Sequence, residues 1–213
     1  MRKNVLHSIG IVLSFSLKML MVGLLIISIF NAQLAWVFGC SFALFLSLIP
    51  TILKNNYEIH LPLILDILIT LALFLHIGGV LLHAYSAIPH YDTLTHFVSS
   101  FIIAFLSFVS IYILDEFWDG LRMDKYAIAF NVVILTVALG VIWELAEWSS
   151  DLLFGTYEQW GYNDTIKDLF VDMIAGLVMA VIGLLLMKQG TFRTLTDDLG
   201  KGISNRLFKR EKR

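Results

Sequence analysis

Long apolar runs, separated by short polar stretches, make up most of the chain and predict helices that cross a membrane. Several runs exceed the roughly 18 apolar residues that identify a bilayer-spanning helix. Polar or turn-forming stretches, such as 31–33 and the segment around Pro89, separate these runs. We therefore expect an all-α bundle of six transmembrane helices. The expected spans cover residues 8–31, 34–53, 61–83, 93–114, 126–148 and 168–187, and a basic tail follows at 188–213.

Composition supports this prediction. The chain has 213 residues, of which 58% are hydrophobic and 15% are charged, and its mean hydropathy is +0.81. Soluble domains average about 45–50% apolar and about 25% charged residues. Six helices use most of this length, so we expect a single transmembrane domain, 1–187, with no second soluble domain. The one cysteine, Cys40, lies in an apolar run, which excludes a disulfide framework and a thiolate metal site.

The distribution of basic residues predicts the orientation. The N-terminus resembles a signal peptide, but no small-x-small cleavage site follows, so we expect a retained first span. Basic residues gather at one set of span ends, whereas the opposite ends hold little besides Lys167. The first set comprises Arg2, Lys3, Lys54, Arg122, Lys125 and the tail. Because basic loops stay in the cytoplasm, we expect a multi-pass protein of the cell membrane with both termini cytoplasmic.

The tail has apolar residues at spacings of three or four from Phe192 to Leu207, interleaved with lysine and arginine. This pattern suits an amphipathic helix on the cytoplasmic leaflet. It suits equally well a solvated basic tail that only enforces the topology. Membrane lipids, rather than nucleic acid, are the partners that the sequence indicates.

Three groups of ionisable residues recur at helical spacing near the ends of spans four, five and six. They are Asp92 and His96; Glu144, Glu147 and Asp151; and Asp164, Asp168 and Asp172. Residues three or four apart share one face of a helix, so each group forms a stripe. The predicted topology places all three stripes at the outer-leaflet ends of their helices. We expect the stripes to converge there.

Converging acids in a membrane need neutralisation. A charge at mid-bilayer costs at least about 2.5–3.5 kcal/mol, and repulsion between like charges adds to this. Protonation of some acids or a bound cation would relieve the cost. Histidine together with carboxylates suits a divalent ion such as zinc, manganese or iron. We predict His96, Glu144, Asp168 and Asp172 as metal ligands, and Glu147 or Asp92 as a general base.

A solvated acidic rim is the alternative, in which the acids only cap helices and Asp164-Thr165 is the N-cap of span six. Other side chains are expected to support the site or contact substrate: His76 and His83 on one face of span three, then His90, Asp151, Asp164, Thr165, Trp143 and Trp148. The two tryptophans fit an interfacial aromatic belt first and a head-group pocket second. Away from these residues, Lys18 on span one and Asp66 on span three are expected to form an ion pair.

Several short motifs together resemble a known family. They are Tyr91-Asp92-Thr93-Leu94-Thr95-His96-Phe97, Trp143-Glu144-Leu145-Ala146-Glu147-Trp148, Gly155-Thr156, and 163–168 with Asp172 and Gly176. This set resembles the YjdF-like inner-membrane proteins over about residues 60–185, and more distantly the VanZ-like group. The VanZ-like proteins are associated with glycopeptide resistance, but this chain lacks the Glu-x2-Gln element of that group. The YjdF-like resemblance implies the fold and the position of the site, and it implies no reaction.

Three classes of function remain open from the sequence. The first is a metal-dependent enzyme acting on a lipid or envelope substrate, and the second is a cation- or proton-coupled transporter. The third is a non-catalytic envelope protein with a structural ion. A glycine-rich phosphate loop, a G-x-S-x-G elbow and an H-E-x-x-H motif are all missing from the sequence, so the corresponding nucleotide, serine-hydrolase and zincin chemistries are set aside.

Overall fold

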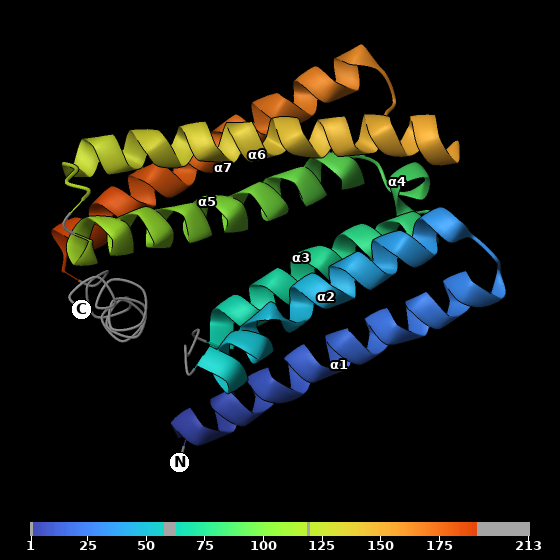
Figure 1. Ribbon diagram of the computed structural model, residues 1–213, viewed down its shortest axis with the longest axis horizontal. Coiled ribbons are helices and arrows are strands. Elements are labelled where there is room, and N and C mark those ends of the chain that lie inside the picture. Colours follow the sequence, from blue (N-terminus) through green and yellow to red (C-terminus); the bar gives the residue numbers. More distant parts are fainter. Residues whose placement is uncertain (1, 58–62, 119, 191–213) are drawn as a thin grey trace, which may run out of the picture.

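The computed structural model describes residues 2–57, 63–118 and 120–190, and in these residues every regular element is a helix (Figure 1). The elements are α1 (Arg2–Phe30), α2 (Leu34–Tyr57), α3 (Leu63–Leu81), the one-turn α4 (Ala84–Ala87), α5 (Tyr91–Phe117), α6 (Lys125–Phe154) and α7 (Tyr162–Lys188). In the described part of the chain, six helices are long and apolar enough to cross a membrane. The predicted all-α, six-span fold is confirmed. The predicted tail lies outside the described residues from 191 onward.

The six long helices form two groups of three (Figure 1). Helices α1, α2 and α3 pack on one another, and so do α5, α6 and α7. Between the groups, α3 contacts α5 and α2 contacts α6. Each group has its own core: Met21, Cys40, Ala43 and Ile77 in the first, and a larger cluster that includes Phe108, Ile128, Val132 and Met179 in the second. The ring of Phe108 lies where a Cβ on Gly183 would stand, so the glycine allows α5 and α7 to approach closely.

The helices around the site are longer than the predicted spans. Helix α6 continues to Phe154 and α7 begins at Tyr162, so a connection of seven residues, 155–161, replaces the expected loop at 149–167. Asp151 explains this tight turn, since its carboxylate accepts hydrogen bonds from Thr156 Oγ1 and from the backbone N–H groups of Glu158 and Gln159, at 2.6, 2.8 and 3.0 Å.

Two local expectations are corrected. Asp164 is not the N-cap of the last span: the cap is Gly161, whose φ of 106° suits glycine, and Asp164 lies in the first turn. His83 does not share a helix face with His76, because α3 ends at Leu81 and His83 adopts a left-handed conformation with φ of 57° before α4. The left-handed backbone at His83 ends the direction of α3 and precedes α4. A second left-handed residue, His90, is the N-cap of α5.

The predicted pair within the first group of helices is confirmed. Lys18 Nζ on α1 lies 2.7 Å from Asp66 Oδ1 on α3, and Lys18 also donates to Ser14 Oγ at 3.0 Å. Both charged side chains are largely buried. An ion pair avoids leaving either charge alone in the bilayer, so this contact joins α1 to α3.

Candidate functional site

The three predicted stripes converge on His96. Its imidazole is buried on α5, with Nε2 3.7 Å from Asp92 Oδ1 and 3.8 Å from Glu144 Oε1. Its other nitrogen, Nδ1, lies 3.4 Å from Asp172 Oδ1. One histidine therefore contacts acids from α5, α6 and α7. The sequence periodicity, together with the antiparallel order of the helices, correctly predicted this meeting point.

Asp172 is the most deeply enclosed acid of the cluster. Its side chain is 1% exposed, and Oδ1 accepts a hydrogen bond of 2.6 Å from Ser100 Oγ, one turn below His96 on α5. Gly140 on α6 faces the same carboxylate, and a Cβ at this position would collide with Asp172 Oδ2. The glycine therefore creates the space in which an acid from α7 reaches the interface with α6.

Lys167 contacts two partly exposed acids and one buried acid of the cluster. Its Nζ lies 2.7 Å from Asp164 Oδ1, 3.4 Å from Asp92 Oδ2 and 3.7 Å from Asp168 Oδ1. The lysine is substantially exposed, whereas Asp168 is 2% exposed. Lys167 therefore neutralises the exposed acids of the cluster better than the buried ones. We call the three buried acids, Glu144, Asp168 and Asp172, the floor of the cluster.

Charge compensation at this floor is incomplete in the described residues. Three carboxylate oxygens are buried without a hydrogen-bond partner there: Glu144 Oε1, Asp168 Oδ1 and Asp172 Oδ2. The acids in and beside the cluster are Asp92, Glu144, Glu147, Asp164, Asp168 and Asp172. Against these six carboxylates stand the ammonium of Lys167 and the imidazole of His96. A buried acceptor normally has a partner, so the arrangement favours an additional cation or bound protons.

Two overlapping groups of side chains have the spacing of metal ligands. Asp92, His96 and Asp168 form one group, and His96, Glu144 and Glu147 form the other. In each group, one potential ligand atom per residue lies within 4.8 Å of the others. Nitrogen together with carboxylate oxygen suits zinc, manganese or iron. Of the four predicted ligands, His96, Glu144 and Asp168 belong to these groups, whereas Asp172 contacts His96 through its opposite nitrogen.

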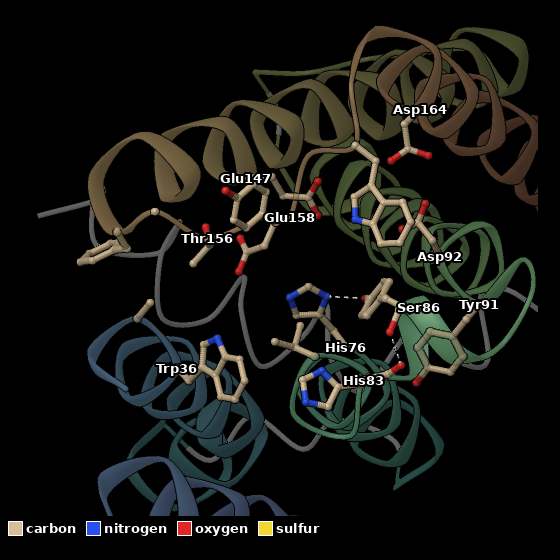
Figure 2. Close-up of a pocket in the computed structure, with 18 of the residues that line it drawn as sticks. Trp36, His76, His83, Ser86, Tyr91, Asp92, Glu147, Thr156, Glu158 and Asp164 are labelled. Carbon is tan, nitrogen blue, oxygen red and sulfur yellow. Dashed lines mark hydrogen bonds between the residues drawn. The ribbon is translucent and has the colours of Figure 1, made fainter. Parts of the chain in front are cut away.

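A cavity of about 920 Å³ opens beside the cluster, between the two groups of helices (Figure 2). Asp92, Glu147, Asp164 and Lys167 connect it to the cluster, and Glu158 adds an acid from the α6–α7 connection. Figure 2 shows these acids along one side and Trp36, His76 and His83 along the other. A cavity of this size accommodates a small-molecule substrate or a lipid head group.

His76 is positioned by a set of aromatic contacts at the cavity wall. Its Nδ1 lies 2.8 Å from Tyr85 Oη, and its ring packs edge-on against Trp143 with centroids 4.7 Å apart. Trp143 in turn donates from Nε1 to Glu147 Oε1 at 2.8 Å. Burial raises the pKa of the Tyr85 phenol, which therefore remains a neutral hydrogen-bonding group. These contacts give Trp143 a role in orienting Glu147, in addition to the one expected at the membrane interface.

The remaining predicted residues have varied positions. His83 and His90 are exposed and line the cavity without contacting the acids around His96. Thr165 accepts a hydrogen bond of 3.1 Å from Gln159 Nε2, which fastens the α6–α7 connection. Asp151 likewise organises that connection. Trp148 is 52% exposed and does not line the cavity, consistent with the aromatic-belt interpretation.

The sequence analysis missed several functional neighbours. Ser100 supports Asp172, Gly140 makes room for it, and Tyr85, Trp36 and Glu158 line the cavity. Ser100 had one detectable signal, since it lies four residues after His96 and therefore on the same helix face. Burial raises the pKa of the Glu158 carboxyl, and no local motif reveals this burial.

Comparison with known proteins agrees with the membrane-spanning fold. Residues 13–189 match the family described as "Predicted membrane protein (DUF2238)". A protein of Thermotoga maritima, described as "Uncharacterized protein", is 30% identical over 135 residues, which is 62% of this chain and 68% of the relative. No solved structure matches the chain.

Proposed function

The chain belongs to the DUF2238 family of predicted membrane proteins, consistent with its YjdF-like motifs, and we propose that it is a metal-dependent enzyme acting on a lipid or envelope substrate. The observation that carries this proposal is the floor of the cluster. There, Glu144 is 5% exposed, Asp168 is 2% exposed and Asp172 is 1% exposed, and each has a buried oxygen that accepts no hydrogen bond in the described residues, with only ion-pair contacts of 3.7–3.8 Å at the oxygens of Asp168 and Glu144. Such buried oxygens around one imidazole are a suitable donor set for a divalent cation.

His96, which both ligand groups share, would ligate through Nε2, with Glu144 from one group and Asp168 from the other as carboxylate ligands. Asp172 then holds the other imidazole nitrogen, a common arrangement that fixes the orientation of a metal-bound histidine. Asp172 would then orient His96 and would not bind the metal itself, in contrast to the ligand role expected from the sequence. Glu147 contributes both to a ligand group and to the cavity wall, and it is therefore well placed to accept a proton from a nucleophile. A bound divalent ion would supply Lewis-acid activation of water or of the substrate oxygen.

Metal analysis tests this proposal. Protein purified in detergent and dialysed against micromolar zinc or manganese is expected to retain about one ion per chain, because the donor set is buried and preformed. Glu144→Gln combined with Asp168→Asn should reduce the retained metal at least about tenfold, because amides do not replace anionic ligands. Elemental analysis by plasma mass spectrometry measures both values.

Asp124→Asn is a matched control, since Asp124 caps α6 by accepting from the backbone N–H groups of Tyr126 and Ala127, and asparagine caps equally well. This variant should retain the metal. Equal retention by the double variant and the control would refute the site. Failure of the wild-type protein to retain any divalent ion would refute metal dependence itself.

Orientation forms part of the proposal, because it decides which side of the membrane supplies the substrate. We infer that the cluster faces outward and that both termini are cytoplasmic, since Arg2, Lys3, Lys54, Arg122 and Lys125 lie toward the opposite end of the helices. The cavity would then open toward the cell envelope.

Cysteine labelling checks this orientation. Tyr157→Cys, at a position that is 93% exposed, should react in intact cells with a membrane-impermeant maleimide. Gln189→Cys, after the end of α7, should react only once the cells are opened. The native Cys40 is buried and should contribute little background. The reverse pattern of labelling would place the site in the cytoplasm.

Transport, the principal alternative, receives less support from the packing. A coupled transporter needs a polar route from the cluster to the opposite end of the helices. Below Ser100, the interface of α5, α6 and α7 consists mainly of apolar side chains, including Ala104, Phe108, Val132 and Met179. The buried hydroxyl of Thr136 donates to a carbonyl of its own helix, Val132 O. Labelled-cation flux into proteoliposomes would nevertheless decide between the two functions, and flux abolished by the Glu144→Gln and Asp168→Asn changes would favour transport.

A further inference from the structure

A second, apolar cavity of about 460 Å³ joins the polar one on the side of α2 and α6. We call it the α2–α6 groove. Its walls come from 35–42 on α2, from the end of α3 and from 143–154 on α6. Small residues facing the space create it: Gly39 and Cys40 on α2, and Ala146 and Ser150 on α6. The two cavities share Ala35, Trp36, His76, Val80, Glu147, Phe154 and Glu158 as lining residues.

Large apolar side chains border the groove and face outward. Phe38, Phe42 and Phe154 are 60%, 61% and 46% exposed. Phe38 and Phe42 lie within a helix that is long and apolar enough to span a membrane, whereas Phe154 is the last residue of another such helix. We therefore expect lipid chains along the α2 side of the groove. A hydrocarbon chain can therefore enter the groove laterally from the bilayer, without crossing water.

The dimensions of the groove select its occupant. One turn of a helix with side chains is about 10–12 Å wide and 5.4 Å high, which corresponds to about 420–610 Å³. The groove therefore holds about one turn, whereas a transmembrane helix of a second copy or another protein needs a seam along most of its length. A flexible acyl chain, by contrast, can occupy an apolar space of this volume. Where the groove joins the polar cavity, it is lined by the acids Glu147 and Glu158. These acids suit the polar head group of a lipid and do not suit a hydrocarbon chain.

We propose that the α2–α6 groove binds an acyl chain of a membrane lipid whose head group occupies the polar cavity. The chain enters between Gly39 and Ala146, and the head group lies beside Glu147 and His76. This inference deepens the proposed function, on which it rests for the reaction, by naming the substrate class as an acyl-chain amphiphile. The metal cluster would act on the head group and not on the hydrocarbon.

Photocrosslinking tests the groove directly. The full chain is reconstituted in vesicles that contain phosphatidylethanolamine with a diazirine in its acyl chain, irradiated, and digested for mapping by mass spectrometry. Adducts on 36–42 and 143–150 are compared with adducts on the exposed face of α1, near Phe15, which report ordinary surrounding lipid. We expect the groove to be labelled several-fold more than the α1 face.

Gly39→Phe should fill the groove and reduce its labelling at least about tenfold, because a benzyl group replaces the space open at Gly39. Gly39→Ala is the matched control: its Cβ would meet only Ile77 Cδ1, at 3.5 Å, so labelling should be unchanged. Ala146→Phe blocks the opposite wall and serves if Gly39→Phe does not fold. A folded variant is recognised by unchanged thermal unfolding.

Three results would overturn the inference: equal labelling of the groove and the α1 face, labelling that persists in both phenylalanine variants, or chain-to-chain crosslinks through the groove. The Glu144→Gln and Asp168→Asn protein separates the two proposals. It should lose metal and keep the groove adducts. Persistent, Gly39-sensitive adducts in a wild-type protein that binds no metal would leave the lipid site valid and refute only the enzyme.

Discussion

Replacing His96 with asparagine is expected to destabilise the protein by about 3–5 kcal/mol and to abolish metal retention, the largest effect of any single change considered. The imidazole is the common neighbour of Asp92, Glu144 and Asp172, at 3.7, 3.8 and 3.4 Å. Without it, the buried carboxylates of Glu144 and Asp172 and the partly exposed one of Asp92 keep their mutual repulsion and lose the group that bridges α5, α6 and α7. Chemical unfolding in a mild detergent, together with metal analysis, measures both consequences.

His83→Asn provides the matched control. His83 is exposed and has a left-handed backbone, which asparagine tolerates well. The same substitution there should change the free energy of unfolding by less than about 0.5 kcal/mol. If the two variants were equally stable, His96 would have no organising role, and the proposed centre would have to be abandoned.

Gly140→Ala is expected to weaken both the helix interface and the site, although it adds only one methyl group. The new Cβ would collide with the carboxylate of Asp172, which Ser100 and His96 hold from the other side. Overpacking of this kind costs about 1–3 kcal/mol. Displacing Asp172 should also disorient His96, and loss of such a supporting contact typically lowers metal affinity about 10–100-fold. Thermal unfolding and a zinc titration report the two effects separately.

Two further variants identify the cause of the stability loss expected for Gly140→Ala. Gly23→Ala makes the same change on α1 where no atom lies within 4 Å of the new Cβ, and should be neutral or slightly stabilising. In an Asp172→Ala background, Gly140→Ala should cost far less than it does in the wild type, because the colliding carboxylate is gone. Equal costs in both backgrounds would show that Asp172 is not what Gly140 accommodates.

Much of the fold follows from local pattern. The length and apolar character of the runs determine which segments become helices in a bilayer, because every backbone hydrogen bond must be satisfied within the membrane. Helical spacing of the acids and the alternating direction of successive spans then place Asp92, Glu144 and Asp168 at one end. The pairing of Lys18 with Asp66 follows from the same reasoning, since each is a charge within an apolar span and needs a partner.

Other features depend on contacts between residues distant in the chain. The sequence predicted a loop at 149–167, whereas Asp151 binds the backbone of the connection and shortens it to 155–161. Nothing near Gly140 indicates that the carboxylate of Asp172 lies against it. Ser100 can be placed on the face of His96 by spacing, but its partner belongs to α7. The α2–α6 groove arises because small residues of two separate helices face each other.

The six-helix membrane architecture, and the end of the bundle at which histidine and acids meet, therefore follow from the residue pattern, since both depend on periodicity along single helices. Packing between the helices sets which nitrogen of His96 faces which acid, how Gly140 admits Asp172, and where the two adjoining cavities lie. Those features are set by rotation of each helix about its axis and by the packing of side chains between helices. These quantities depend on all the neighbouring helices together, and no single helix encodes them.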